Sequence, residues 1–168
     1  MTPPFPAPTA DDIEKVSAQL GRPARDVVGI SARTASGEPT VVSTAPRLSD
    51  GTPFPTFYYL THPAATAAVS QLEADGTMRE LGERLDADEE LRSAYARAHE
   101  AYLADRAQEG EVPEIDGISA GGMPTRVKCL HALVAHSLAA GPGVNPIGDL
   151  ALELADWSPE DVAPDGPA

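Results

Sequence analysis

The spacing of hydrophobic residues changes near residue 63, which divides the chain into two kinds of structure. Before that point, three runs rich in β-branched and aromatic residues are separated by turn-forming residues, and they cover residues 27–32, 40–44 and 56–61. Their connections are short, which favours antiparallel pairing. The pattern therefore predicts a small antiparallel sheet of about three strands within residues 26–62, preceded by a helix that ends at Leu20 and is capped by Asp11 or Asp12.

After residue 63, apolar residues recur every three or four positions, as they do on one face of a helix. Helices are predicted over residues 64–74, 78–85, 88–108, 125–140 and 145–154, the third capped by Asp86 or Asp88. These elements make an α+β domain over residues 11–155, in which the sheet packs against four to six helices. The proline-rich residues 1–10 and the acidic residues 156–168 are expected to be disordered.

The acidic charge of the chain disfavours some partners. The formal net charge is -14, from 26 acidic and 12 basic residues, which opposes binding to nucleic acid and to anionic membrane surfaces. Fourteen of the acids lie in residues 64–118, where they form either solvated helix faces or a surface that docks on an unidentified basic protein partner. There is no apolar run long enough to span a membrane, no secretory signal, and only one cysteine, so we expect a cytoplasmic protein.

Candidate chemistry gathers in residues 121–149, which hold a single acidic residue. Cys129 and His131 lie two positions apart, and on a helix that starts at residue 125 they would point in different directions. A metal site therefore needs the helix to begin near residue 130, or a ligand from elsewhere in the chain. His62, at the end of the third expected strand, is the outside candidate, and zinc is the metal that His62, Cys129 and His131 would bind.

Cys129 also suits two roles without a metal. A thiol near a helix N-terminus has a lowered pKa, and His131 beside it would act as a base, so a thiol-dependent hydrolase or transferase is a second hypothesis. The sequence marks no Asn or Asp as the group that would orient this histidine. The simpler alternative is that Cys129 is a small buried apolar residue.

Glycines and basic residues indicate a third kind of site, for a small anion. Gly121 and Gly122 precede the predicted helix, where backbone N–H groups can approach a phosphate or carboxylate closely. Arg126 and Lys128 follow them, and Arg47 lies in the proline-rich loop at 45–55. A plain glycine turn with solvated cations is the alternative.

Of these hypotheses the sequence favours a binding domain for a small anionic ligand, such as a phosphate. Its site would be built from residues 44–63 and 121–136. The loop at 45–55 is then expected to lie near the loop at 119–125, with His62, Cys129 and His131 lining a pocket between them.

Two long motifs resemble a known family. They are TAPRLSDGTPFPTFYYLTHP at residues 44–63 and GGMPTRVKCLHALVAHSLAAGPGVNPIGD at residues 121–149. Both are similar to the bacterial, mainly actinobacterial, family filed as domain of unknown function 501, and the likeness extends over residues 11–150. The family name implies no activity.

The resemblance also implies that relatives carry cysteine where this chain has Thr34, and that some carry cysteine where it has His62. If relatives bind a metal through positions 34, 62 and 129, this chain offers Thr34, which is a poor ligand. A redox pair of cysteines is excluded here because Cys129 is the only cysteine.

Overall fold

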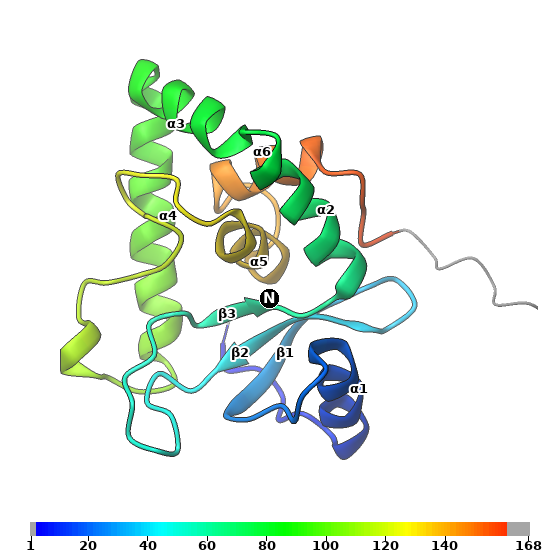
Figure 1. The fold of residues 1–168 in the computed structure, drawn as a ribbon. Helices are drawn as coiled ribbons and strands as arrows, with labels where there is room; N and C mark the ends of the chain where they lie inside the picture. The colour runs from blue at the N-terminus through cyan, green and yellow to red at the C-terminus, as the bar shows by residue number, and fades with distance from the viewer. Residues whose placement is uncertain (1–2, 161–168) are drawn as a thin grey trace, which may run out of the picture.

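A three-stranded antiparallel sheet and six α-helices make up the computed structural model, which describes residues 3–160 (Figure 1). The strands are β1 (Val27–Arg33), β2 (Pro39–Thr44) and β3 (Tyr58–Leu60), in the order β1-β2-β3. This confirms the predicted α+β class and the antiparallel sheet. Within the described residues, no helix is both long and apolar enough to cross a lipid bilayer.

The central strand β2 is covered on both faces, and all six of its residues are buried. On one face Val42 packs with Ile30 and with Val16 of helix α1 (Ala10–Leu20). On the other face Val41 belongs to the main core. The sheet therefore has helices on both sides, with α1 alone on the outer face and the remaining helices on the inner face (Figure 1).

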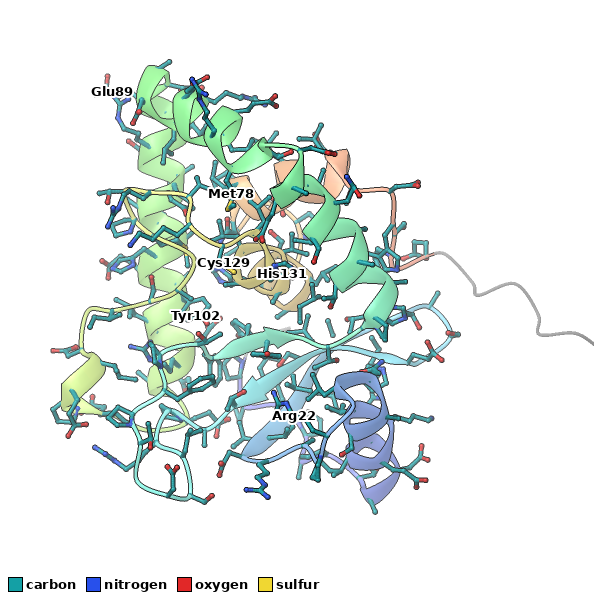
Figure 2. The ribbon with its side chains drawn as sticks, viewed as in Figure 1. Arg22, Met78, Glu89, Tyr102, Cys129 and His131 are labelled. Atoms are coloured by element: carbon teal, nitrogen blue, oxygen red, sulfur yellow. The ribbon has the colours of Figure 1, made fainter. Side chains whose placement is uncertain are left out.

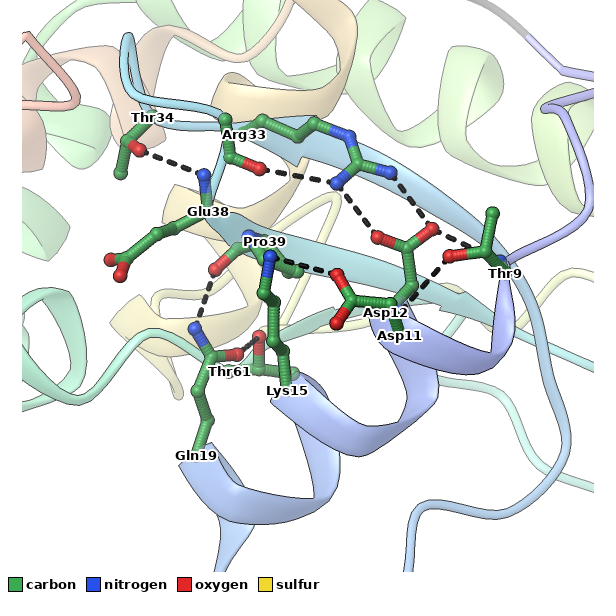
Figure 3. Close-up of polar contacts among 11 residues, drawn as sticks. Thr9, Asp11, Asp12, Lys15, Gln19, Arg33, Thr34, Glu38, Pro39 and Thr61 are labelled. Carbon is green, nitrogen blue, oxygen red and sulfur yellow. Dashed lines mark hydrogen bonds and ion pairs between the residues drawn. The ribbon is translucent and has the colours of Figure 1, made fainter.

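Helix α1 is held to the sheet by polar contacts at both of its ends (Figure 3). Its N-cap is Thr9, which forms a capping box with Asp12, so the predicted cap at Asp11 or Asp12 was wrong by a few residues. The two terminal nitrogens of the Arg33 guanidinium, Nη1 and Nη2, donate to the Asp12 carboxylate at 2.9 and 3.0 Å. These hydrogen bonds hold the pKa of Asp12 well below its usual range. At the other end, Gln19 donates to the carbonyl oxygen of Pro39.

Five of the described α-helices lie on the inner face of the sheet, and one of them is buried among the others. They are α2 (Pro63–Ala74), α3 (Thr77–Ala87), α4 (Glu89–Ala107), α5 (Leu130–Ala140) and α6 (Pro146–Leu154), with a short 3-10 helix at Pro113–Ile115. Helix α5 is the central one, because eight of its residues are buried and it contacts all three strands, α2 and α6. At Gly148, α6 lies so close to α5 that an added Cβ would lie 2.2 Å from the carbonyl oxygen of Leu133.

The predicted start of the central helix was wrong by five residues. Helix α5 begins at Leu130, not at residue 125. Residues 121–129 form a loop because Gly121 and Gly122 adopt positive φ angles and their carbonyl oxygens accept hydrogen bonds from the backbone N–H groups of Lys128 and Arg126. These bonds hold the chain out of the helix until Cys129, which becomes the N-cap.

Both ends of the described chain pack on the sheet and its loops. Phe5 is buried and meets Tyr58 edge-on, which differs from the disorder expected for residues 1–10. At the other end, Trp157 lies against His62, and the carbonyl oxygen of Pro159 accepts a hydrogen bond from the N–H of Ala35. The rest of the expected disordered tail, residues 161–168, and residues 1–2 lie outside the described part.

A neutral histidine is enclosed in the aromatic core. His136 has no exposed surface, stacks on Tyr58 with ring centroids 5.6 Å apart, and meets Tyr102 edge-on at 5.1 Å. Its Nδ1 lies 3.1 Å from the side-chain nitrogen of Asn145, whose amide donates, so the ring proton is on Nε2. Within the described residues Nε2 has no hydrogen-bond partner. Burial lowers the pKa of His136 to about 4.

This histidine predicts a loss of stability in mild acid. Below its ordinary pKa of 6.5 the unfolded chain binds a proton that the folded state does not bind until the pH falls to about 4. The free energy of unfolding should therefore fall between pH 6.5 and pH 4, by roughly 3 kcal/mol from His136 alone. Urea denaturation at several pH values, compared with the non-titrating variant His136→Gln, measures this difference.

The comparison of the wild type with His136→Gln isolates the contribution of His136 to the pH dependence. Asp105, which accepts a hydrogen bond from Tyr58, has a pKa raised by burial, so it acts in the opposite direction. Because Asp105 is present in every variant, its contribution cancels in the comparison. An equal pH dependence in the wild type and in His136→Gln would contradict the assignment.

Candidate metal and thiol site

Three side chains of different chemistry converge where the C-terminal half of α2 meets the start of α5. Glu73, Cys129 and His131 each offer one donor atom, and these atoms lie within 4.8 Å of one another. All three side chains are half-buried. Figure 2 shows Cys129 and His131 together at the start of α5. Among the described residues, this is the one group of three or more such side chains with a spacing that suits a metal ion.

The cluster forms because a buried helix needs partners for its first N–H groups. Cys129 is the N-cap of α5, but its side chain makes no capping hydrogen bond. Instead, Oε1 of Glu73 accepts a hydrogen bond of 2.9 Å from the N–H of Leu130. A carboxylate is favoured at this position because the N-terminus of a helix carries partial positive charge.

The same carboxylate oxygen orients His131. Nδ1 of His131 lies 3.1 Å from Oε1 of Glu73, and Nε2 lies 3.1 Å from the hydroxyl oxygen of Ser70, one turn earlier on α2. Both ring nitrogens therefore have partners on one helix. A histidine held on both sides in this way has a fixed ring orientation, as histidines that bind metals usually do.

The electrostatics of the site favour a thiolate. A hydrogen bond with His131 lowers the pKa of Cys129, more strongly than burial raises it. The same hydrogen bond raises the pKa of His131, and the negative charge of Glu73 raises it further. Both shifts favour the charged forms of the pair, and a thiolate is the form that binds metals and acts as a nucleophile.

The structure does not bring His62 into this cluster. His62 is the N-cap of α2, at the opposite end of the helix from Glu73, and eleven residues of helix correspond to about 16 Å. Its Nε2 lies 3.3 Å from a carboxylate oxygen of Glu38, and its ring lies 5.5 Å from that of Trp157. The outside ligand expected from the sequence is therefore replaced by Glu73.

The residues predicted to bind an anion lie in two separate loops of the chain, at 45–55 and 121–129. Arg47 pairs with Glu114 and donates to the carbonyl oxygen of Gly51, so the loop at 45–55 lies beside the 3-10 helix. The side chains of Arg126 and Lys128 are exposed, and neither forms an ion pair with another described residue.

The glycine pair has a structural role of its own. A Cβ on Gly121 would lie 2.6 Å from the side chain of Leu133, and a Cβ on Gly122 would lie 2.5 Å from the carbonyl oxygen of Arg126. Glycine is therefore required at both positions for the loop to close against α5. Cys129 lies eight positions after Gly121, so the glycine pair does not form the N-terminus of α5.

Sequence reasoning missed Glu73 and Ser70. Glu73 is one of 26 acidic residues, and 57 positions separate it from Leu130. One signal was available: Val69 and Leu72 form the buried face of α2, and Glu73 lies four positions after Val69, on the edge of that face. An acid placed beside an apolar stripe needs a partner, and here the partners are Leu130 and His131.

Comparisons with known proteins give a family and no activity. A family model described as "Protein of unknown function (DUF501)" matches residues 30–153, which is most of the chain and includes every residue of the cluster. No curated protein and no solved structure matches the chain.

Removal of the carboxylate should destabilise the buried helix. Glu73→Ala leaves the N–H of Leu130 without its acceptor, and we expect the free energy of unfolding to fall by about 1–2 kcal/mol. Glu73→Gln keeps an acceptor oxygen and should lose less than half of that amount. The control is Gln71→Ala, an exposed position on the same helix, whose side chain bonds only to Asp75. Equal losses in Glu73→Ala and Glu73→Gln, measured by urea denaturation, would contradict a capping role.

The thiol should react as an activated cysteine. In metal-free protein, the rate of alkylation of Cys129 by iodoacetamide should reach half its maximum at a pH below that of an ordinary thiol, because the hydrogen bond with His131 lowers the pKa of the thiol. His131→Ala should move this midpoint upward. His62→Ala removes a histidine that lies outside the cluster and should leave it unchanged. A midpoint that stays the same in His131→Ala would show that His131 does not activate the thiol.

Proposed function

Since the chain belongs to this family of unknown function, we propose its function from geometry alone: it is a zinc protein that binds the ion through Glu73, Cys129 and His131. The observation that carries the proposal is the convergence of a carboxylate, a thiol and an imidazole within 4.8 Å. Ligands around a tetrahedral zinc ion lie about 3.4 Å apart, so small side-chain rotations would complete the site.

Three protein ligands leave one position of a tetrahedral ion open. Structural zinc sites normally use four protein ligands, whereas sites with three ligands bind water or substrate at the fourth position. The half-buried setting of the cluster supports access from solvent. We therefore propose a catalytic type of site, in which an ion held by Glu73, Cys129 and His131 would supply Lewis-acid chemistry for hydrolysis or group transfer on a small molecule.

The neighbours of the three ligands support this assignment. The hydroxyl oxygen of Ser70 is placed to accept a hydrogen bond from Nε2–H of His131, which would leave the lone pair of Nδ1 for the ion. The N–H of Leu130 already fixes one oxygen of Glu73. A reduced thiol at Cys129 suits a reducing compartment, and we propose that the protein works in the cytoplasm.

A thiol enzyme without a metal is the second candidate, supported by the lowered pKa of Cys129. The geometry gives it less support, because Nδ1 of His131 faces Glu73 and Nε2 faces Ser70. In a thiol–histidine–carboxylate triad, opposite ring nitrogens contact the thiol and the carboxylate.

The anion-binding and protein-docking hypotheses remain predictions. For the former, Arg47 is engaged by Glu114, and the carboxylate of Glu73 occupies the N-terminus of α5, where an anion would bind. For the latter, the acidic residues of α3 and α4 supply the charge, and a docked basic partner would dissociate as salt is raised.

Elemental analysis of the purified, untagged protein tests the zinc assignment. We expect about one equivalent of zinc in the wild type and little in Cys129→Ala or His131→Ala, because each variant removes one of three ligands. Ser70→Ala should keep the ion but bind it about 10–100-fold more weakly, as expected for a residue that orients a ligand.

The matched control is His62→Ala, which should keep its zinc. Zinc should also raise the melting temperature of the wild type and not that of Cys129→Ala, since binding stabilises the folded state. Failure of the metal-free wild type to bind added zinc would refute the proposal. Catalysis by metal-free protein that is lost in Cys129→Ser would establish the thiol enzyme instead.

A further inference from the structure

A cavity lies on the outer face of the sheet, on the opposite side from the proposed zinc site. Its volume is about 330 Å³, which is at the lower end of the range for small-molecule sites. It is bounded by the C-terminal end of α1, the connection at residues 22–27, the outer side chains of β2 and β3, and the loop at 44–54. Val42 and Tyr59 face this side, whereas Val41 and Tyr58 face the core that contains α5.

The wall of the cavity combines apolar and aromatic surface. Leu20, Val27 and Val42 form one side of it, and Phe54 and Tyr59 add aromatic rings. Tyr59 is 37% exposed and is one of three large hydrophobic side chains, among the described residues, that reach the surface. An exposed aromatic ring at the mouth of an apolar cavity is a surface on which a flat ring can stack.

Two arginines at this cavity have no acidic partner. The other three basic residues before residue 63 form ion pairs: Lys15 with Asp11, Arg33 with Asp12, and Arg47 with Glu114. Arg22 and Arg25 both line the cavity, and neither is in an ion pair with any residue that the structure describes. Figure 2 shows Arg22 on the side of the sheet where α1 lies. In a chain with a net charge of -14, these two guanidinium groups without an acidic partner are available to pair with an anion.

The two acidic residues of the cavity wall accept hydrogen bonds from residues of the loop. The carboxylate of Asp26 accepts hydrogen bonds from the N–H and the hydroxyl of Ser49, and that of Asp50 accepts one from the N–H of Thr52. Both carboxylates are therefore engaged by donors of the loop. The two arginines are the groups in the wall that remain available to a negative charge.

The loop that closes the cavity is held in a fixed shape. Asp26 adopts a left-handed conformation with φ 57°, and its carbonyl oxygen accepts a hydrogen bond from the N–H of Ala45. Within the loop, the N–H of Leu48 donates to Thr52 and the N–H of Phe54 donates to Pro46. A cavity whose walls are already ordered binds a ligand without the entropic cost of ordering them.

We propose that this cavity binds a small planar aromatic molecule that carries a carboxylate or a phosphate. The ring stacks against Tyr59 and Phe54 over the apolar floor, and the anionic group pairs with Arg22 and Arg25. Aromatic carboxylates and mononucleotides both have this chemistry. The site is independent of the zinc site because the sheet lies between them.

Binding to the full chain can be followed by ¹H–¹⁵N NMR with defined probes. 4-Hydroxybenzoate and adenosine monophosphate represent the two sources of the ligand chemistry. 4-Hydroxybenzamide, adenosine, acetate and inorganic phosphate are the matched compounds that lack either the charge or the ring. We expect at least one aromatic anion to shift the amide signals of Val27, Val42 and Ser49, and the better of the two identifies the source. Each matched compound should bind at least about tenfold more weakly than the aromatic anion that it matches.

The Arg22→Ala, Arg25→Ala double variant should weaken binding by about tenfold or more, because it removes both cationic groups. Both positions are exposed, so the variant should fold. Tyr59→Ala should also weaken binding. Arg84→Ala, an exposed arginine of α3 outside the cavity, should bind like the wild type, and all four proteins should have equal zinc content.

Three results would overturn the proposal. The first is no shift near the cavity with either aromatic anion at millimolar concentration. The second is equal binding of inorganic phosphate or of the uncharged aromatic compounds, which would show that charge and ring are not recognised together. The third is unchanged affinity in the double arginine variant.

Discussion

One carboxylate oxygen, Oε1 of Glu73, links the two helices on which the candidate site depends. It accepts a hydrogen bond from the N–H of Leu130 and lies beside Nδ1 of His131. It therefore caps the start of α5 and orients the histidine at the same time. Since the side chain of Cys129 makes no capping hydrogen bond, the helix takes its acceptor from α2. The carboxylate, the thiol and the imidazole therefore lie together because the first N–H groups of a buried helix need hydrogen-bond acceptors.

The burial of α5 also explains where the chemistry can be. Most of the helix is enclosed by the sheet and by its neighbours, and its interior histidine, His136, is kept neutral among Tyr58 and Tyr102. A helix of this kind meets solvent mainly at its ends. His131, in the first turn, is the histidine that keeps part of its surface exposed, and this is why it can serve a ligand or a metal while His136 serves the core.

The sequence was sufficient for most elements because their patterns are local. The hairpin between β1 and β2, the strand around Tyr58 and the helices α2 to α4 follow from apolar spacing and from breakers such as Gly76. The start of α5 was not predictable in this way, because residues 125–129 have no helix breaker of their own. They are held out of the helix by hydrogen bonds to Gly121 and Gly122, which are contacts within a folded loop.

The same limit applies to the site. Cys129 and His131 could be chosen because they are neighbours in an unusual stretch, and the need for a ligand from another segment followed from helix geometry. Which segment would supply it depends on how α2 crosses α5, and that is a property of packing. His62 was a reasonable choice at the end of a strand, but it begins α2, whereas the contact with α5 is made one helix length later, by Glu73.

The sheet separates the two candidate sites, and the two arginines of the outer cavity lie outside the family match. Glu73, Cys129 and His131 all lie within residues 30–153, on the face that carries α5. Arg22 and Arg25 lie before residue 30, in the connection between α1 and β1, on the opposite face. Substitutions at these arginines would alter the outer cavity without touching any group that holds Glu73 against α5. The fold therefore allows the specificity of the outer cavity to change while the thiol, imidazole and carboxylate stay in place.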